Sequence, residues 1–289
     1  MEHKGKSVWQ IWCISKAEYV KCFCNPRIVL FLMAIWFTYN FAMEPLIGHA
    51  KKMGESMGFL EPFLGICNSE LLFSIIPVIF LCMIGDFPME DGNTDFFLPR
   101  VGRYRWLFGQ MVFQAEAVLT YLVSMFLATQ VLCGEYLSYT GEWSSVVTKY
   151  YMAYPEEQMD MASRLLTDRL YNNFTPQMAC LHTFCLFFCY LTLLGMIKMC
   201  FFLWNNKLLG LVASGSVIAV GGALAHVSTG AKWLFPTANA LEWMHCDRVL
   251  GIREVTMGQS YLYFLILIGV LTIICVCRID AYAFTDKQK

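Results

Sequence analysis

Long apolar runs recur along this chain, and they constrain its fold more than any other feature of the sequence. A helix needs about 20 apolar residues to cross the hydrocarbon core of a bilayer. Six segments approach that length, and they cover residues 28–47, 71–87, 106–133, 176–203, 208–227 and 259–277. The second segment is short, so we expect it to be tilted or extended back towards Pro62. The pattern predicts an all-α integral membrane protein with six transmembrane helices in a single domain over residues 1–289.

The composition favours the same class of protein. Hydrophobic residues make up 57% of the 289 residues and charged residues only 15%, whereas soluble domains average about 45–50% and about 25%. A soluble core of this size cannot take up that excess, but a bilayer accepts apolar surface on every side. The net charge of -1 gives no basic balance of the kind that indicates a nucleic-acid partner.

The basic residues between these segments predict the orientation of the chain. Positive residues gather in short cytoplasmic loops. The loops on the side of the two termini carry Lys4, Lys6, Lys16, Lys21, Arg27, Arg100, Arg103, Arg105, Lys198, Lys207, Arg278, Lys287 and Lys289. The opposite side carries the smaller set Lys51, Lys52, Lys149, Arg164, Arg169, Lys232, Arg248 and Arg253. We therefore expect a multi-pass protein of the plasma membrane with both termini in the cytoplasm.

Residues 7–24 have the pattern of an interfacial helix. Trp9, Trp12 and Tyr19 recur at three- and four-residue spacings, with basic residues among them. Aromatic and basic side chains on one helix suit the headgroup layer of a membrane. We expect this helix to lie at the interface before the first span, although an ordinary cytoplasmic extension would give a similar pattern.

Two longer connections separate the later spans. Residues 134–175 are polar and mix charged residues with leucines and methionines, which predicts a small extracytoplasmic loop region with helices. This region is too short to be an independent enzyme domain. Residues 228–258 form the second connection, before the last span.

The motifs that carry enzymatic chemistry are missing from the sequence. It contains neither the GxxxxGK[ST] loop that binds ATP nor the HExxH pair of zinc proteases. The 13 cysteines lie mostly inside apolar runs and lack zinc-site spacing. We therefore predict no catalytic residue, no metal site and no cofactor in this chain.

Glu116 is the acidic residue within the third apolar segment. A carboxylate in a membrane span is costly unless it is paired or faces water. It therefore either lines a transport pathway, or bonds to a neighbouring helix, or lies near the interface if the span begins late.

The connection between the second and third spans carries the most informative motif. Residues 84–110 read IGDFPMEDGNTDFFLPRVGRYRWLFGQ. This stretch resembles the cytoplasmic connection between the second and third helices of bacterial ABC-2-type transporter permeases. The matching positions are Asp91, Gly92, Asp95, Phe97, Leu98, Pro99, Arg103 and Tyr104. The layout of an N-terminal amphipathic helix, six spans and a re-entrant stretch before the last span is also similar, and it implies a re-entrant segment at residues 228–258. The loop 134–175 is longer than the family's compact form.

The resemblance implies that separate subunits form the membrane path and hydrolyse ATP. This chain would form the membrane path of an ATP-binding-cassette exporter, and a separate nucleotide-binding ATPase subunit would hold the ATP and Mg. The coupling loop that contacts this partner would use Phe96, Phe97 and Leu98 as an apolar anchor, with Arg100, Arg103 and Arg105 binding carboxylates. A second permease copy, or a related permease, would complete the dimer.

Two other readings of the residues stay open. The arginines of the loop also fit a role in setting topology alone. A stand-alone secondary transporter or channel, with Glu116 in its pathway, is the alternative function.

Overall fold

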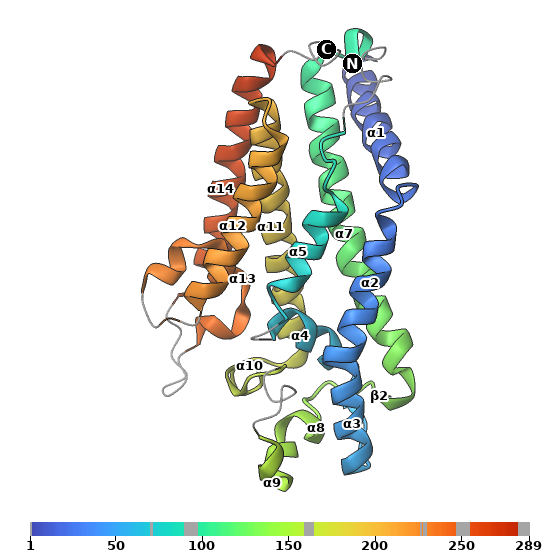
Figure 1. Cartoon of the computed structure of the whole chain (residues 1–289), viewed down its shortest axis with the longest axis vertical. Helices are drawn as coiled ribbons and strands as arrows, with labels where there is room; N and C mark the ends of the chain where they lie inside the picture. Colours follow the sequence, from blue (N-terminus) through green and yellow to red (C-terminus); the bar gives the residue numbers. More distant parts are fainter. Residues whose placement is uncertain are drawn as a thin grey trace.

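The computed structural model describes residues 2–69, 72–89, 98–158, 165–225, 227, 230–246 and 255–282, with side chains from residue 7 onward. Its long helices run side by side along one axis and form a bundle (Figure 1). Within the described residues, five helical stretches are long and apolar enough to cross a membrane. These stretches are Ile28–Met53, Arg103–Tyr136, Pro176–Leu203, Lys207–Ala225 and Met257–Ala281. The prediction of an all-α membrane protein is confirmed at this level.

These five stretches are built from the longest elements of the chain. The first joins α2, a π-helical turn η1 and α3, and the others contain α7, α11, α12 and α14. Their bounds are Ile28–Thr38 for α2, Tyr39–Met43 for η1, Glu44–Met53 for α3, Arg103–Cys133 for α7, Pro176–Leu203 for α11, Lys207–Ala225 for α12 and Met257–Arg278 for α14. Two 3-10 turns extend α7 and α14, namely η2 at Gly134–Tyr136 and η7 at Ile279–Ala281.

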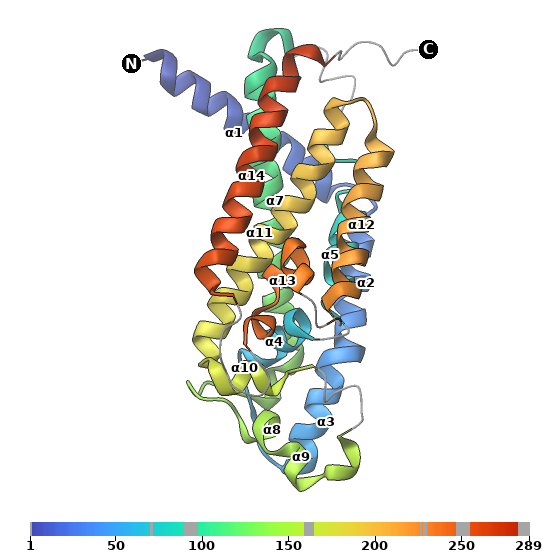
Figure 2. The same cartoon turned by 90° about the vertical axis from the view of Figure 1, so that its left-hand side faces the viewer.

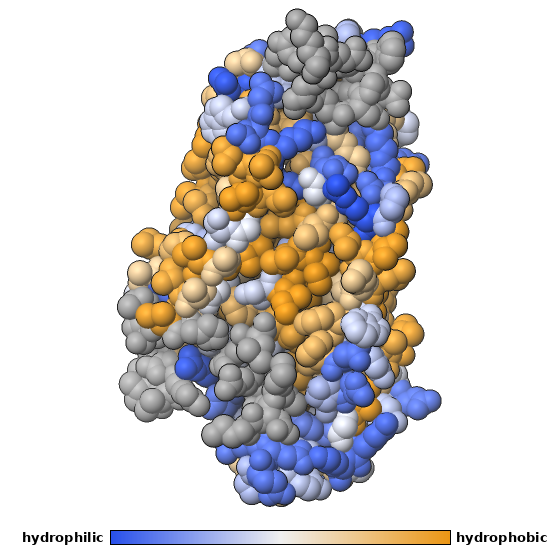
Figure 3. Space-filling model, viewed as in Figure 1, coloured by the Kyte–Doolittle hydropathy of each residue, from blue (hydrophilic) through white to orange (hydrophobic). Residues whose placement is uncertain are grey.

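The surface shows the distribution expected for a chain in a bilayer. In Figure 3 hydrophobic residues dominate a band across the middle of the molecule, and hydrophilic residues gather towards the two ends of its long axis. Isolated apolar side chains are common on soluble proteins, but a contiguous apolar band marks a surface that another apolar phase covers. The exposed leucines, valines and isoleucines of α12 and α14 contribute to this surface.

The predicted second span, over residues 71–87, is not one long helix. Two short helices are found instead, α4 at Glu61–Asn68 and α5 at Ile75–Met83. The nine residues of α5 extend about 14 Å at 1.5 Å per residue, about half of the hydrocarbon thickness. The break follows α4 directly, because Ser69 takes an extended backbone conformation and its hydroxyl accepts a hydrogen bond from the Leu72 N–H at 3.2 Å. Such local side-chain bonds compete with helix continuation.

The order of the helices brings both described ends of the chain to one end of the bundle. Figure 1 shows the start of α1 (Glu2–Phe23), the end of α14, the start of α7 and the turn from α11 to α12 at the same end. The short helices α8, α9 and α10 lie at the other end. Two termini on the same side are what the orientation predicted from the basic residues requires, and the cytoplasmic assignment of that side stays a prediction.

The predicted interfacial helix at residues 7–24 falls within α1. Figure 2 shows α1 crossing α7 at an angle and projecting away from the bundle at its N-terminal end. Ile14, Ser15 and Glu18 are buried against the bundle, whereas Trp9 and Trp12 are exposed. Ser15 and Glu18 therefore face the protein and the tryptophans face outward, which suits a helix in contact with lipid.

A small cap closes the bundle at the end opposite the termini, where residues 134–175 are predicted to be extracytoplasmic. Its helices are α8 at Ser145–Thr148, α9 at Tyr150–Ala153, the 3-10 turn η3 at Pro155–Glu157 and α10 at Asp168–Asn173. Two short strands pair in parallel, β1 at Met57–Gly58 and β2 at Leu137–Ser138. The buried Glu61 carboxylate joins the two parts of the cap, because it accepts hydrogen bonds from the Gly58 N–H at 2.8 Å and from the Ser144 N–H and hydroxyl at 2.6 and 2.7 Å.

A second contact connects the cap to α3, and we expect its contribution to the stability of the cap to depend on pH. Hydrogen bonds from the Lys52 ammonium and the Tyr150 hydroxyl lower the pKa of the Glu157 carboxyl below its ordinary value. A lowered pKa means that the ionised carboxylate stabilises the folded cap. This contribution is present above the ordinary pKa of glutamate and is lost as the pH falls through the lowered pKa of the folded state.

The test is amide hydrogen exchange of residues 145–158 in detergent between pH 7 and pH 3, corrected for intrinsic exchange rates. We expect the wild-type segment to lose protection as the pH falls. Glu157→Gln should be less protected at neutral pH and should lose the pH dependence. Glu156→Gln is the matched control, because Glu156 is exposed and should leave the profile unchanged. A pH profile that persists in Glu157→Gln would contradict this assignment.

The segment between α12 and α14 folds back into the protein, as far as it is described. It comprises the 3-10 turn η5 at Gly230–Leu234, the helix α13 at Pro236–Ala240 and the 3-10 turn η6 at Glu242–His245. Residues 236–246 are all buried, and α13 packs against α11, α12 and α14. The predicted re-entrant segment at 228–258 stays a prediction, and its residues 228, 229 and 247–254 lie outside the described part.

Hydrogen bonds connect several of the polar groups in this buried segment. The His245 Nε2 lies 2.8 Å from the Ser260 hydroxyl, which donates to the Asn239 side-chain oxygen at 2.9 Å. The Asn239 amide nitrogen donates in turn to the Trp233 carbonyl at 2.9 Å. Irregular backbone is tolerated at membrane depth only where it is buried in protein in this way.

Candidate functional site: the joint at the α5–α7 end

The C-terminal end of α5 is held by a buried lysine of α11. The Lys198 ammonium donates to the carbonyl of Ile84 and, at 3.1 Å, to the carbonyl of Gly85. The last carbonyls of a helix lack partners within the helix and carry partial negative charge, so a cation there is favourable. Burial of the lysine makes these bonds strong relative to surface contacts. Sequence reasoning used Lys198 only as an indicator of topology, although a lysine within the apolar run 176–203 is itself a signal of a specific role.

The turn that follows α5 is attached to two further helices. Arg27, which precedes α2, forms an ion pair of 2.8 Å with Asp86. The Lys207 ammonium, at the start of α12, donates to the Pro88 carbonyl at 3.4 Å. Both charged groups of the Arg27–Asp86 pair are substantially exposed, so the pair adds little stability by itself. Its effect is to fix where the turn lies relative to α2.

The predicted coupling loop is described only in part. Phe96 and Phe97 lie outside the described residues. Leu98 begins a single helical turn and packs against the hydrophobic core. Gly102 closes that turn, since its N–H donates to the Leu98 carbonyl at 2.8 Å, and its φ of 89° is one that glycine adopts readily.

The three arginines of the predicted loop have different surroundings. Arg103 donates to the carbonyls of Ile279 and Asp280, next to a hydrogen bond from Tyr104 to the Asp280 carboxylate. Arg105 donates to the Ser7 hydroxyl at 3.1 Å, and therefore joins α7 to α1.

Arg100 differs from both. Its side chain is exposed and takes part in no hydrogen bond or ion pair among the described residues. Nothing in the sequence separates the three arginines, whereas the structure leaves Arg100 as the one best placed for a contact outside the chain.

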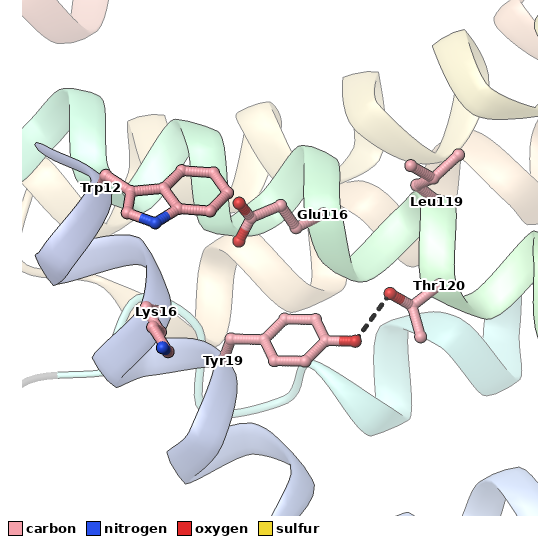
Figure 4. A pocket seen from close by; sticks show the side chains of 6 residues that line it. All are labelled: Trp12, Lys16, Tyr19, Glu116, Leu119 and Thr120. Atoms are coloured by element: carbon pink, nitrogen blue, oxygen red, sulfur yellow. Dashed lines mark hydrogen bonds between the residues drawn. The ribbon is translucent and has the colours of Figure 1, made fainter. Parts of the chain in front are cut away.

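Glu116 lies on the face of α7 against which α1 packs. The Ser15 hydroxyl donates to its Oε2 at 2.5 Å. Together with Trp12, Lys16, Tyr19, Leu119 and Thr120 it lines a pocket of about 300 Å³ between the two helices (Figure 4). Of the roles left open by the sequence, the structure shows the bond to a neighbouring helix.

The contacts at the α5–α7 end connect most of the long helices, and we call this region the joint. Through side chains, the short connection contacts α11, α12 and the segment before α2, while the start of α7 contacts α1 and the end of α14. Within the described residues no group of three or more His, Cys, Asp or Glu side chains could hold a metal ion. Comparison of the chain with protein-family models, curated proteins and solved structures gave no match.

Proposed function

We propose that this chain is the membrane-spanning permease subunit of an ATP-binding-cassette exporter. The observation that carries the proposal is the joint at the α5–α7 end. The connection is exposed at Arg100, and buried or charged contacts hold it on both sides. It is therefore suited to be displaced by a docked partner and to move the attached helices with it. The resemblance of residues 84–110 to ABC-2-type permeases points to the same segment.

The proposal includes a placement in the plasma membrane. The five long stretches would each cross the bilayer, and α4 with α5 would together make a sixth, broken crossing. The end with the joint and both termini would be cytoplasmic, and the cap would be extracytoplasmic. Buried contacts of α4 with α7 and α11, and of α5 with α2, α11 and α12, support the broken crossing, because irregular backbone at membrane depth must be enclosed by protein.

The partner would be a separate ATPase subunit that binds ATP and Mg, with a second permease copy or a related permease completing the pathway. Arg100 would bind a carboxylate of the ATPase, and Leu98 with the neighbouring phenylalanines at positions 96 and 97 would be the apolar anchor. Lys198 would act inside the chain, because it connects the end of α5 with α11. Docking and transmission are thereby assigned to different residues.

Affinity purification of the tagged chain from its native membrane in mild detergent tests docking. We expect an ATPase with a P-loop to copurify in stoichiometric amount. Arg100→Glu should reduce its recovery about tenfold, since one charge-assisted hydrogen bond contributes about 1.5–3 kcal/mol. Lys149→Glu, a reversal of an exposed charge in the cap, is the matched control and should leave recovery unchanged. Absence of any P-loop ATPase would overturn the proposal.

Lys198→Met tests transmission separately from docking. Methionine preserves most of the buried side-chain volume but removes the bonds to the Ile84 and Gly85 carbonyls. We expect the ATPase still to copurify while the change in its hydrolysis rate on binding the permease is lost. Size-exclusion chromatography checks that the variant remains folded. Unaltered stimulation in a folded Lys198→Met protein would remove this lysine from the coupling mechanism.

A stand-alone secondary transporter or channel remains the alternative to the permease. It would place Glu116 in an ion pathway, whereas this carboxylate is engaged by Ser15 at the contact of α1 with α7. An ATPase-free protein whose ion-driven flux disappears in Glu116→Gln would favour the alternative.

A further inference from the structure

The pocket between α1 and α7 combines an open cation with an apolar wall. Lys16 is exposed and, among the described residues, has no hydrogen bond or ion pair. It lies on α1 one helical turn from Trp12 and close to one turn from Tyr19, and all three line the pocket. An ammonium group with no protein partner, flanked by aromatic rings, is a site for an anionic oxygen such as a phosphate.

The carboxylate of Glu116 supplies the opposite charge in the same pocket. Figure 4 shows it pointing from α7 towards α1, beside the ring of Trp12. Ser15 occupies Oε2 at 2.5 Å, and within the described residues no hydrogen bond reaches Oε1. Lys16 and Glu116 line one cavity without forming an ion pair with each other. The cavity therefore offers one unpaired cation and one available carboxylate oxygen.

An apolar stripe on α7 continues away from these charges. Leu119 lines the pocket, and Val123 and Leu127 follow it at four-residue spacing. All three are exposed, and residues at this spacing lie on one face of a helix. The stripe extends about 12 Å along α7 at 1.5 Å per residue, which suits an acyl chain lying against the helix. The arrangement of charges at one end and apolar surface below them matches an amphipathic lipid.

We propose that this pocket binds a phospholipid whose headgroup carries both a phosphate and a primary ammonium, the chemistry of phosphatidylethanolamine. The phosphate contacts Lys16, the ammonium donates a hydrogen bond to Glu116 Oε1, and an acyl chain lies along Leu119, Val123 and Leu127. The proposal rests on the membrane placement of the chain but not on its coupling to an ATPase. The lipid proposal can therefore fail while the permease proposal holds, and the permease proposal can fail while the lipid proposal holds.

The headgroup chemistry sets the expected selectivity. Phosphatidylcholine has the same charges but a quaternary ammonium without an N–H donor, so it loses the hydrogen bond to Glu116. Phosphatidylglycerol has the phosphate but no cation, so its headgroup leaves the Glu116 carboxylate without a counter-charge. Of the three, phosphatidylethanolamine alone supplies both a phosphate for Lys16 and an N–H donor for the Glu116 carboxylate.

Native mass spectrometry of the purified full-length protein in micelles with equal amounts of the three lipids tests this selectivity. We expect phosphatidylethanolamine to be retained roughly threefold to tenfold over each competitor, the range expected for the net contribution of one ordinary hydrogen bond at a partly exposed site. Glu116→Gln should remove the preference over phosphatidylcholine while keeping an acceptor for Ser15. Lys16→Gln should reduce retention of all three lipids.

Lys149→Gln, which removes an exposed lysine of the cap, serves as the matched control and should keep the wild-type pattern. Both pocket variants alter exposed or half-exposed side chains, so they are expected to fold normally, and their elution as a single species verifies it. Equal retention of the three lipids by the wild type would overturn the proposal. Preferential retention of phosphatidylglycerol would also overturn it, since that pattern identifies a site for anionic lipid through Lys16 alone. An unchanged preference in Glu116→Gln would exclude the carboxylate from the site.

Discussion

Replacing Glu61 with alanine is expected to lower the free energy of unfolding by about 3 kcal/mol, because buried donors that lose their acceptor cost about 1–3 kcal/mol each. The carboxylate is 1% exposed and accepts three hydrogen bonds, from the Gly58 N–H and from the N–H and hydroxyl of Ser144. Alanine leaves all three donors without this partner. Since Gly58 lies in β1 and Ser144 immediately precedes α8, the loss separates the two halves of the cap.

Thermal unfolding in detergent measures the effect on stability, and hydrogen exchange of residues 137–148 locates it. Glu61→Gln should be intermediate, because its side-chain oxygen still accepts but its amide group adds donors to a buried site. Glu55→Gln is the matched control, since Glu55 is exposed and should change stability by less than about 0.5 kcal/mol. A Glu61→Ala protein with wild-type stability and wild-type exchange at residues 137–148 would show that the carboxylate does not hold the cap.

Substituting alanine for Gly221 is expected to destabilise the protein by about 1–3 kcal/mol, the usual effect of overpacking a well-packed contact. A Cβ atom at position 221 would lie 2.1 Å from the Thr237 hydroxyl oxygen and 2.7 Å from its Cβ. Thr237 cannot move away freely, since it is buried in α13 and its hydroxyl lies 3.1 Å from that of Tyr190. The added methyl group therefore pushes α13 away from α12.

Gly215 in the same helix provides the matched control. A Cβ atom there would have no neighbour within 4 Å. Gly215→Ala is expected to be neutral or to stabilise the helix by up to about 1 kcal/mol, because alanine has the higher helix propensity. Melting temperatures of the two variants in one detergent test the difference. Equal melting temperatures would show that the α12–α13 contact relaxes without penalty.

The amino-acid sequence by itself determined the class of the protein and the positions of most long helices. Apolar runs of membrane-spanning length at 106–133, 176–203, 208–227 and 259–277 correspond to α7, α11, α12 and α14. Hydropathy and composition are local properties that bound a helix without knowledge of its neighbours. The same reasoning placed a helix over residues 7–24 and expected helices in the loop 134–175.

The second predicted span contains a break that the local properties of the sequence did not predict. Residues 71–87 are apolar enough for a span, but the chain breaks at Ser69 and resumes as the nine-residue α5. The break is tolerated because α7 and α11 pack against α4 while α2, α11 and α12 pack against α5. Hydropathy does not report this enclosure, because the enclosure depends on segments that are far away in the chain.

The partners of the functional side chains were decided by the tertiary structure alone. Lys198 reaches Ile84 across 114 positions, Glu116 accepts from Ser15 across 101, and Ser144 donates to Glu61 across 83. Each contact depends on which faces of two helices meet and on the register between them, neither of which is encoded within a single segment. The resemblance of residues 84–110 therefore identified Arg100, Arg103 and Arg105 as candidates, and hydropathy identified Glu116. Packing then distinguished an arginine open to a partner from those that bind within the chain.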